Sequence, residues 1–264
     1  MLVTCACGIV CGVLRAEPAD HPTDDTQAEQ PLELFELSLE ELMKVTVTIA
    51  SKHPTPWWQS PAAVYVVTGE DIRRKGALSI PEALRYVPGL HVARIDSNRY
   101  AISSRGFNGE FANKLLVLMD GRVLYTPMFS GVFWDVQDTV IEDIDQIEVV
   151  RGPGATLWGS NAVNGVINVT TKSAADTQGW LISGGYGSEE RGFGTVRYGG
   201  MLDEGVAFRV YGKGFNRDDF PLAGGGSAQD DWHQGRGGFR FDFDGSDSDT
   251  LTVQGDFYAG RVDS

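Results

Sequence analysis

The second half of the chain alternates between apolar and polar residues with a period of two. Segments 206–215, 238–244 and 250–258 each place apolar side chains on one face and charged or polar side chains on the other. Segments 202–205 and 245–249 are short turns, whereas 216–235 is a long polar loop. Short connections at one end and long ones at the other are typical of membrane β-barrels. The alternative is a soluble antiparallel sheet with one packed face.

Residues 60–172 follow another pattern, in which short apolar runs are interrupted by helix signals. Thr68 and Asp71 have the spacing of a capping box for a helix over 69–75, and Ser79 precedes a helix with Pro81 in its first turn. Asp120 and Gly121 predict a tight hairpin turn. We expect a helical turn at 141–145 and strands at 62–67, 90–95, 100–107, 114–119, 122–125 and 146–150. This pattern predicts an α+β domain with a mixed sheet and short helices.

The run RGPGATLWGSNAVNGVINVTTK, residues 151–172, contains the densest turn signals of the chain. Gly152, Pro153 and Gly154 end a β-branched run. Further residues that tolerate a positive φ follow, namely Gly159, Asn161, Asn164 and Gly165. Alternation then resumes over 166–171. We expect two strands joined by a compact turn.

The N-terminal region has the layout of an exported protein. Cys5, Cys7 and Cys11 lie in an apolar opening, so residues 1–16 are interpreted as a signal peptide cleaved near Ala16, although no Lys or Arg precedes the apolar run. Residues 17–59 form a flexible segment, in which residues 32–43 have apolar side chains at helical spacing and Ser38 is an expected N-cap before Glu40 and Glu41. Residues 44–51 are β-prone.

Composition excludes several classes of function. A formal net charge of −14 argues against nucleic-acid binding. No GK[ST] ending follows the glycine-rich run, and the four histidines are scattered, so we expect neither an enzyme, a cofactor nor a metal site. The acidic loop around 218–231 is interpreted as solvated rather than as a cation site. No run of about 18 apolar residues occurs, so any membrane span would be a β-strand.

Seven segments in order resemble the TonB-dependent outer-membrane receptors. They are PAAVYVVTGEDI, SIPEALRYVPGL, SRGF, KLLVLMDGR, FSGVFWDVQD, IEVVRGPGA and LWGSNAVNGVINVTTK. The resemblance is closest to the branch of colicin I and catecholate-siderophore receptors. It implies a plug domain over 60–172, followed over 179–264 by the first antiparallel strands of an outer-membrane β-barrel.

The resemblance also implies functions for particular residues. A TonB box is expected at Val45, Thr46, Val47, Thr48 and Ile49, where an extended segment would add a strand to a TonB-type protein of the inner membrane. The alternative is that this run is only the first strand of the domain. Arg105 and Arg151 would contact acidic residues of the barrel wall, or else pair locally with Asp145 or Glu148. Loops facing the ligand would carry Arg94, Asp96, Arg99, Tyr100, Phe107, Tyr125, Phe129 and Trp134.

Such receptors take up ferric siderophores, cobalamin or similar scarce ligands across the outer membrane, where lipid surrounds the barrel. The residues after Gln178 suffice for about five strands, whereas plugged barrels use about 22. We therefore expect a fragment or a truncated gene. The competing hypothesis is a plug-like periplasmic module that binds or senses a ligand without transport.

Overall fold

The structure is a computed structural model that describes residues 12–16, 46–49, 55–56, 59–60, 62–126, 131–222, 224–246 and 249–262. The chain divides into two compact units. The mixed unit comprises residues 22–95 and 99–171, and the strand unit comprises residues 1–21, 96–98 and 172–264. The expected helix over 32–43, Val45, Phe129 and residues 1–11 of the expected signal peptide lie outside the described residues.

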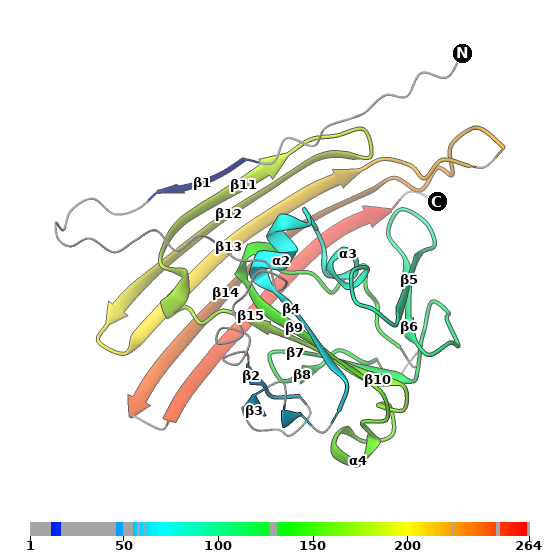
Figure 1. Ribbon diagram of the computed structural model, residues 1–264. Helices are drawn as coiled ribbons and strands as arrows, with labels where there is room; N and C mark the ends of the chain where they lie inside the picture. The colour runs from blue at the N-terminus through cyan, green and yellow to red at the C-terminus, as the bar shows by residue number, and fades with distance from the viewer. Residues whose placement is uncertain are drawn as a thin grey trace. The chain divides into compact units, whose positions relative to one another are not determined.

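The mixed unit is built on a five-stranded sheet in the order β4-β9-β10-β7-β8 (Figure 1). Its strands are β4 (Val64–Thr68), β7 (Leu115–Met119), β8 (Arg122–Val123), β9 (Ile144–Arg151) and β10 (Gly165–Thr171). Strand β10 runs parallel to β7 and antiparallel to β9, so the sheet is mixed. The run of aliphatic residues in β7 is buried along its whole length, as expected for a strand covered on both faces.

The two faces of this sheet carry separate hydrophobic clusters. Alternate residues of the central strands, such as Val117, Val149 and Ile167, enter a large cluster with side chains of the short helices. The intervening residues face the other side, where a smaller cluster, the lower cluster, contains Ile49, Leu116, Leu118, Val150, Ala162 and Val166. The period of two in a strand thus decides which cluster each side chain joins.

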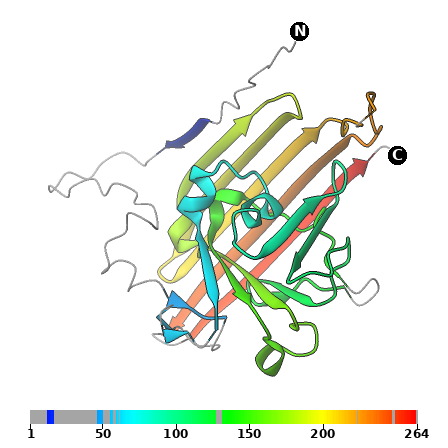
Figure 2. The same cartoon turned by 45° about the vertical axis from the view of Figure 1, so that its right-hand side comes forward.

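The helices are short: α2 (Gly69–Arg74), α3 (Ile80–Leu84), α4 (Ala155–Trp158) and the 3₁₀ turn η2 (Ile141–Asp143). The predicted capping box is confirmed, because Thr68 Oγ1 accepts from the Asp71 N–H at 3.1 Å and Asp71 accepts from the Thr68 N–H at 3.0 Å. Helix α3 begins after Ser79 as predicted, but the Ser79 hydroxyl makes no capping hydrogen bond. In both views α4 is a short turn at one extremity of the unit (Figure 2).

Two small antiparallel pairs complete the mixed unit. Strands β5 (Leu90–Arg94) and β6 (Tyr100–Ser104) form a hairpin, and β2 (Thr46–Val47) pairs with β3 (Thr55–Pro56). The prediction that the second hairpin strand reaches residue 107 is wrong, because β6 ends at Ser104. Arg105, Gly106 and Phe107 have φ values of 58°, 89° and 56°. These values lie in the left-handed region, which a β-strand cannot contain.

The strand unit is a six-stranded antiparallel sheet in the order β1-β11-β12-β13-β14-β15 (Figure 1). Its elements are β1 (Gly12–Ala16), η3 (Ala175–Thr177), β11 (Gly179–Gly185), β12 (Glu190–Asp203), β13 (Val206–Arg217), β14 (Trp232–Ser246) and β15 (Asp249–Val262). Strands β13, β14 and β15 extend beyond the predicted segments at one or both ends. Within the described residues the sheet is open, with β1 and β15 at its edges.

The predicted alternation divides this sheet into two chemically different faces. One face is apolar and exposed, and includes Trp180, Ile182, Val196, Tyr198, Val210, Phe239, Leu251, Val253 and Phe257. Buried polar residues point the other way, including Ser183, Thr195, Arg197, Arg209, Gln234, Arg236 and Asp242. The segment that precedes β11 is bonded to the polar residues: Arg209 donates to the Lys172 carbonyl at 2.8 Å, and Asp242 accepts from the Ala174 N–H at 2.7 Å.

Close packing at Gly165 gives a test of the mixed sheet. A Cβ at this position would lie 2.5 Å from the Val150 carbonyl oxygen and 3.1 Å from Leu115 Cδ1. We expect Gly165→Ala to lower the free energy of unfolding by about 1–3 kcal/mol through overpacking, measured by urea denaturation. Gly109→Ala is the matched control, because a Cβ there meets no atom within 4 Å. Equal stability of the two variants would contradict the described register.

Candidate docking site for the N-terminal segment

The segment 46–49 begins with strand β2 and turns at Ile49, and its last two residues are bonded to the mixed sheet. Strand β2 pairs with β3, with Thr46 opposite Pro56 and Val47 opposite Thr55. After β2, the chain turns its N–H groups towards one carboxylate. Thr48 N–H donates to Glu148 Oε1 at 3.1 Å, and Ile49 N–H donates to Glu148 Oε2 at 2.9 Å. The Thr48 hydroxyl lies 3.3 Å from Oε1 and provides another donor.

Glu148 is fully buried in the centre of the sheet. It lies on β9, between Val66 of β4 and Asn168 of β10, and its side chain is 0% exposed. Its position in the alternation places it on the same face as the lower cluster. Gln146 Nε2 donates to Glu148 Oε1 at 2.8 Å. The partners described for this carboxylate are therefore main-chain, hydroxyl and amide donors, none of which is a cation.

Trp158 holds the segment from a second side. Its indole Nε1–H donates to the Ile49 carbonyl oxygen at 2.7 Å, while the Ile49 side chain, 1% exposed, packs into the lower cluster. The turn α4 positions the indole, because the Trp158 N–H bonds to the Gly154 carbonyl at 2.9 Å. Gly154 has no room for a side chain, since a Cβ would lie 2.9 Å from Val166 Cγ2.

The contacts of Glu148 and Trp158 with this segment were not foreseen from the sequence. A carboxylate inside the β-branched run 147–150 was the available signal, because a glutamate is seldom fully buried without partners. Its partners lie 99 and 100 residues away along the chain. The pattern of residues within one short segment contains no information about a contact between positions so far apart.

The two arginines of the SRGF and VRGP motifs lie beside each other. Arg105 Nη2 donates to the Arg151 carbonyl at 3.0 Å, and Arg151 Nη1 donates to the Pro88 carbonyl at 3.2 Å. Both guanidinium groups thus use main-chain oxygens of their own unit. Among the described residues neither forms an ion pair, so the local pairing with Asp145 or Glu148 is not present there.

The residues expected to face a ligand occupy several different environments. Tyr100 and Trp134 belong to the large core cluster and are 4% and 7% exposed. Tyr125 is partly buried against the lower cluster. Arg94 pairs with Tyr100 across the β5–β6 hairpin. The three aromatic residues therefore contribute to packing in the mixed unit, and Arg94 lies in its hairpin.

Arg99 and Phe107 are exposed but lie at opposite ends of β6. Arg99 Nη1 is 3.4 Å from Glu110 Oε1. Phe107 is 76% exposed, with the Lys114 ammonium 3.9 Å from its ring centroid. Because β6 separates them, the structure does not bring these two residues together.

Asp96 belongs to the short piece 96–98 that groups with the strand unit. Its carboxylate accepts from the Asn98 N–H at 3.2 Å. Next to it, the Ser97 N–H donates to Asp230 at 2.8 Å, and Arg217 donates to the Ser97 carbonyl at 2.9 Å. Burial alone would raise the pKa of Asp230, but the N–H groups of Phe220 and Ser97 hold it below its usual value.

The pKa of Asp135, which follows the buried Trp134 in the chain, is shifted in the opposite direction to that of Asp230. Burial raises the pKa of its carboxyl group, and the main-chain N–H groups of Asp135 and Val136 oppose that rise. The negative charge of Glu110 also raises the pKa, whereas Arg99 lowers it. The charged residues near 99, 110 and 135 therefore influence one another electrostatically.

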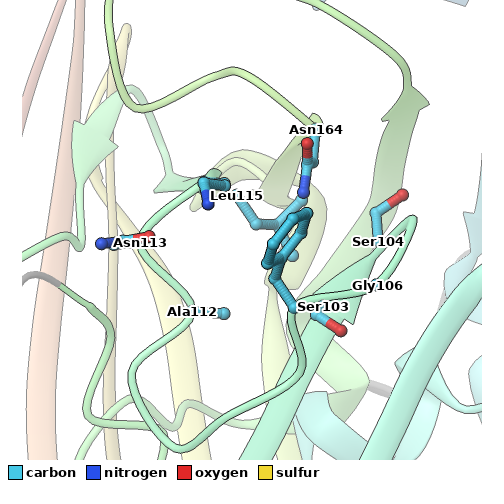
Figure 3. A pocket seen from close by; sticks show the side chains of 9 residues that line it. Ser103, Ser104, Gly106, Ala112, Asn113, Leu115 and Asn164 are labelled. Atoms are coloured by element: carbon cyan, nitrogen blue, oxygen red, sulfur yellow. The ribbon is translucent and has the colours of Figure 1, made fainter.

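A small hollow lies beside the left-handed turn at 105–107. Ala112 and Asn113 lie on one side of it and Ser103, Ser104 and Gly106 on the other (Figure 3). Its enclosed volume is about 10 Å³, which is roughly the space that one water molecule needs. The hollow is therefore too small to hold a siderophore or a cobalamin.

Two further classes of site were sought in the described part of the chain. No group of three or more His, Cys, Asp or Glu residues is arranged there to hold a metal ion. Among the same residues, no helix combines the length and the apolar character needed to cross a membrane.

Comparison with known proteins identifies the mixed unit. Residues 58–166 match the family described as the TonB-dependent receptor plug domain. The vitamin B12 transporter BtuB of Vibrio vulnificus strain CMCP6 is 34% identical over 164 residues, which are 59% of this chain and 26% of that protein. The chain therefore spans about a quarter of the length of this curated relative.

Solved structures share the fold at lower identity. The pyoverdine outer membrane receptor FpvA from Pseudomonas aeruginosa PAO1 has a TM-score of 0.65 at 20% identity, covering 81% of this chain and 30% of that chain. The ferric yersiniabactin uptake receptor FyuA from Yersinia pestis has a TM-score of 0.61 at 20% identity, covering 75% and 32%.

The fold and these matches define the class of domain that the chain contains: a mixed α+β plug followed by antiparallel strands. Residues 58–166 are a plug domain of the TonB-dependent receptor type, and the fold of the chain is similar to part of such receptors. The predicted fold class and family are thereby confirmed. The matched proteins are transporters and receptors rather than enzymes, as the sequence predicts. The assignment to the branch of colicin I and catecholate-siderophore receptors stays a prediction.

Substitution of the buried Trp134 and of the exposed Arg99 tests which of these two expected ligand-facing residues belongs to the core. We expect Trp134→Ala to lower the free energy of unfolding by about 3–5 kcal/mol, because a buried ring leaves a cavity. Arg99→Ala should change it by less than about 1 kcal/mol, since its ion pair is exposed. Chemical denaturation of both variants measures the difference. An unchanged stability of Trp134→Ala would show that this ring is not part of the core.

Proposed function

We propose that this chain is the N-terminal part of an outer-membrane transporter that takes up a scarce ligand using energy from the inner membrane. The observation that carries the proposal is the segment 46–49, which precedes the plug domain and is held on it mainly through its own main-chain groups. A segment held in this way can exchange its main-chain hydrogen bonds for those of another strand. Val45 to Ile49 is the proposed TonB box.

The ligand class is proposed from the relatives. The curated relatives are vitamin B12 transporters, and the similar structures include receptors for ferric pyoverdine and ferric yersiniabactin. A ferric siderophore or cobalamin therefore fits the proposal. Arg99 and Phe107 are the exposed members of the expected ligand-facing set, and Asp96 is partly buried. The buried Tyr100 and Trp134 would support these loops from inside the plug.

The strand unit supports a location in the outer membrane. Its exposed apolar face and buried polar face have the arrangement of a barrel wall with lipid outside and a polar interior. We also propose that residues 1–16 are a signal peptide that directs export of the protein. Arg105 and Arg151 would seat the plug against acidic residues of the wall, because two adjacent guanidinium groups that bond to no carboxylate in the described part of the chain favour an anionic partner.

Deletion of residues 45–49 tests the transport function. In the full-length receptor we expect energised uptake of radiolabelled ligand to fall to the level of a strain without the inner-membrane partner. Binding of the ligand to the cell surface should be unchanged, because the ligand-facing loops are intact. Deletion of the five residues 26–30, upstream of the segment, is the control.

Unchanged uptake after the 45–49 deletion would contradict the TonB-box assignment. If the intact receptor binds the ligand but takes up none, the competing hypothesis is favoured, namely a plug-like periplasmic module that senses a ligand without transport.

A further inference from the structure

We propose that residues 172–178, which connect the plug to strand β11, are a fixed anchor rather than a hinge. Charged side chains of β12, β13 and β14 hold this stretch, which we call the anchor segment, by its main chain. Opening of the plug must then come from changes within it, and not from a swing of the whole domain about its C-terminal connection. The inference rests on the proposed function, because it concerns how the plug opens during transport.

Two charged side chains hold the beginning of the anchor segment. Arg209 of β13 donates to the Lys172 carbonyl oxygen at 2.8 Å, and Asp242 of β14 accepts from the Ala174 N–H at 2.7 Å. Arg209 and Asp242 are each 5% exposed, and Ala174 is 0% exposed. Hydrogen bonds to charged groups are stronger than neutral ones, and burial strengthens them further by removing competing water. The beginning of the segment is therefore held firmly.

Strand β12 holds the end of the anchor segment. Arg197 donates to the Thr177 carbonyl oxygen, and Thr177 is buried. Gly199 lets the two main chains touch, because a Cβ at this position would overlap the Thr177 carbonyl group. Only a residue without a side chain allows such a close approach of two backbones.

The Asp242 carboxylate is positioned by other donors before it meets the segment. Arg240 Nε–H lies 3.0 Å from Asp242 Oδ1 and 2.9 Å from Oδ2, and the Thr252 hydroxyl donates to Oδ1 at 2.7 Å. These donors come from β14 itself and from the neighbouring β15. A side chain that is already ordered loses little conformational entropy when it binds the segment. Asp242 is thus a preorganised acceptor for the Ala174 N–H.

The anchor segment is also stiff within itself. The Ser173 hydroxyl accepts from the Asp176 N–H at 3.1 Å and donates to the Asp176 carboxylate at 2.6 Å. The Thr177 hydroxyl donates to the Ser173 carbonyl at 3.1 Å. A hinge needs residues that absorb large changes of φ and ψ. Such changes would break these bonds across η3, so the segment is unsuited to act as a hinge.

A fixed anchor limits how the plug can open. The residues that hold the segment lie on β12, β13 and β14, which are paired side by side. A swing about residues 172–178 would break the bonds to all three strands together, whereas changes confined to residues 58–171 leave them intact. A pull on the N-terminal side of the plug also needs a fixed point to act against. We infer that the anchor segment supplies this point.

Amide hydrogen exchange in the full-length receptor tests whether the anchor segment is fixed. In wild type we expect Ala174 and Thr177 to exchange at least 100-fold more slowly than in an unstructured peptide, an estimate of about this order for a bonded and buried amide. Asp242→Asn should speed exchange at Ala174 about tenfold, which corresponds to the loss of one charge-assisted hydrogen bond. Exchange of both wild-type amides at the rate of an unstructured peptide would refute the anchor.

Asp256→Asn is the matched control. Asp256 lies on β15, on the same polar face, and its described partner is Arg236 at 3.0 Å. Exchange at Ala174 should be the same in this variant as in wild type. Thermal unfolding shows which variants fold.

If Asp242→Asn does not fold, Gly199→Ala decides the outcome. Its Cβ would displace the Thr177 carbonyl from β12, so exchange at Thr177 should become faster. Gly192→Ala on the same strand is its control, because a Cβ there meets no atom within 4 Å. Equal exchange at Thr177 in these two variants would refute the close contact on which the anchor depends.

Uptake by cells separates the anchor from the proposed function. The probe is radiolabelled cobalamin or radiolabelled ferric pyoverdine, whichever the wild-type receptor takes up. We expect Asp242→Asn to lower uptake about fivefold or more, the usual range for coupling between distant sites, with binding of the probe unchanged. Faster exchange at Ala174 with unchanged uptake would refute the anchor and leave the proposed function standing. Uptake of neither probe by wild type would count against the proposed function, while exchange still decides whether the segment is fixed.

Discussion

A buried carboxylate that has no cationic partner among the described residues is the constraint on which the site depends. Glu148 is fully buried in the interior strand β9. A charge in that position requires hydrogen-bond donors, since desolvation without them costs several kcal/mol. The nearby strands use their own N–H groups in the sheet, so the donors come from elsewhere. The segment 46–49 supplies most of them, beside the amide of Gln146, and an otherwise unfavourable burial becomes the reason that this segment is held in place.

The remainder of the mixed unit makes this arrangement possible. The alternation of β9 directs Val149 to the large cluster and Glu148 to the face of the lower cluster. The glycine-rich turn after β9 then returns the chain through α4, which brings the Trp158 indole to the Ile49 carbonyl. The motif of residues 151–172 therefore does more than join two strands. It builds one side of the docking site.

Much of the fold could be predicted from local sequence, because the signals were local. The capping box of Thr68 and Asp71, the Asp120–Gly121 turn and the period of two in β13 to β15 each depend on residues a few positions apart. The end of β6 at Ser104 was missed, because Arg105 and Phe107 adopt positive φ values that their residue types do not indicate.

The site was predicted less completely than the fold. The position and β-prone character of residues 45–49 were visible, and the resemblance supplied a function for them. The contacts with Glu148 and Trp158 join residues about a hundred positions apart and depend on the sheet register. Likewise, aromatic type alone could not separate the buried Tyr100 and Trp134 from the exposed Phe107. Burial is decided by the strand and turn that carry each ring.

Amide hydrogen exchange at Thr48 and Ile49, in the full-length receptor without ligand, tests the central claim most directly. Their N–H groups donate to a buried carboxylate, so exchange must wait for release of the segment. The account predicts slow exchange at both amides in wild type and clearly faster exchange in Glu148→Gln, with the amides of β9 unchanged. Exchange of Thr48 and Ile49 at the rate of an unstructured peptide in wild type would contradict it.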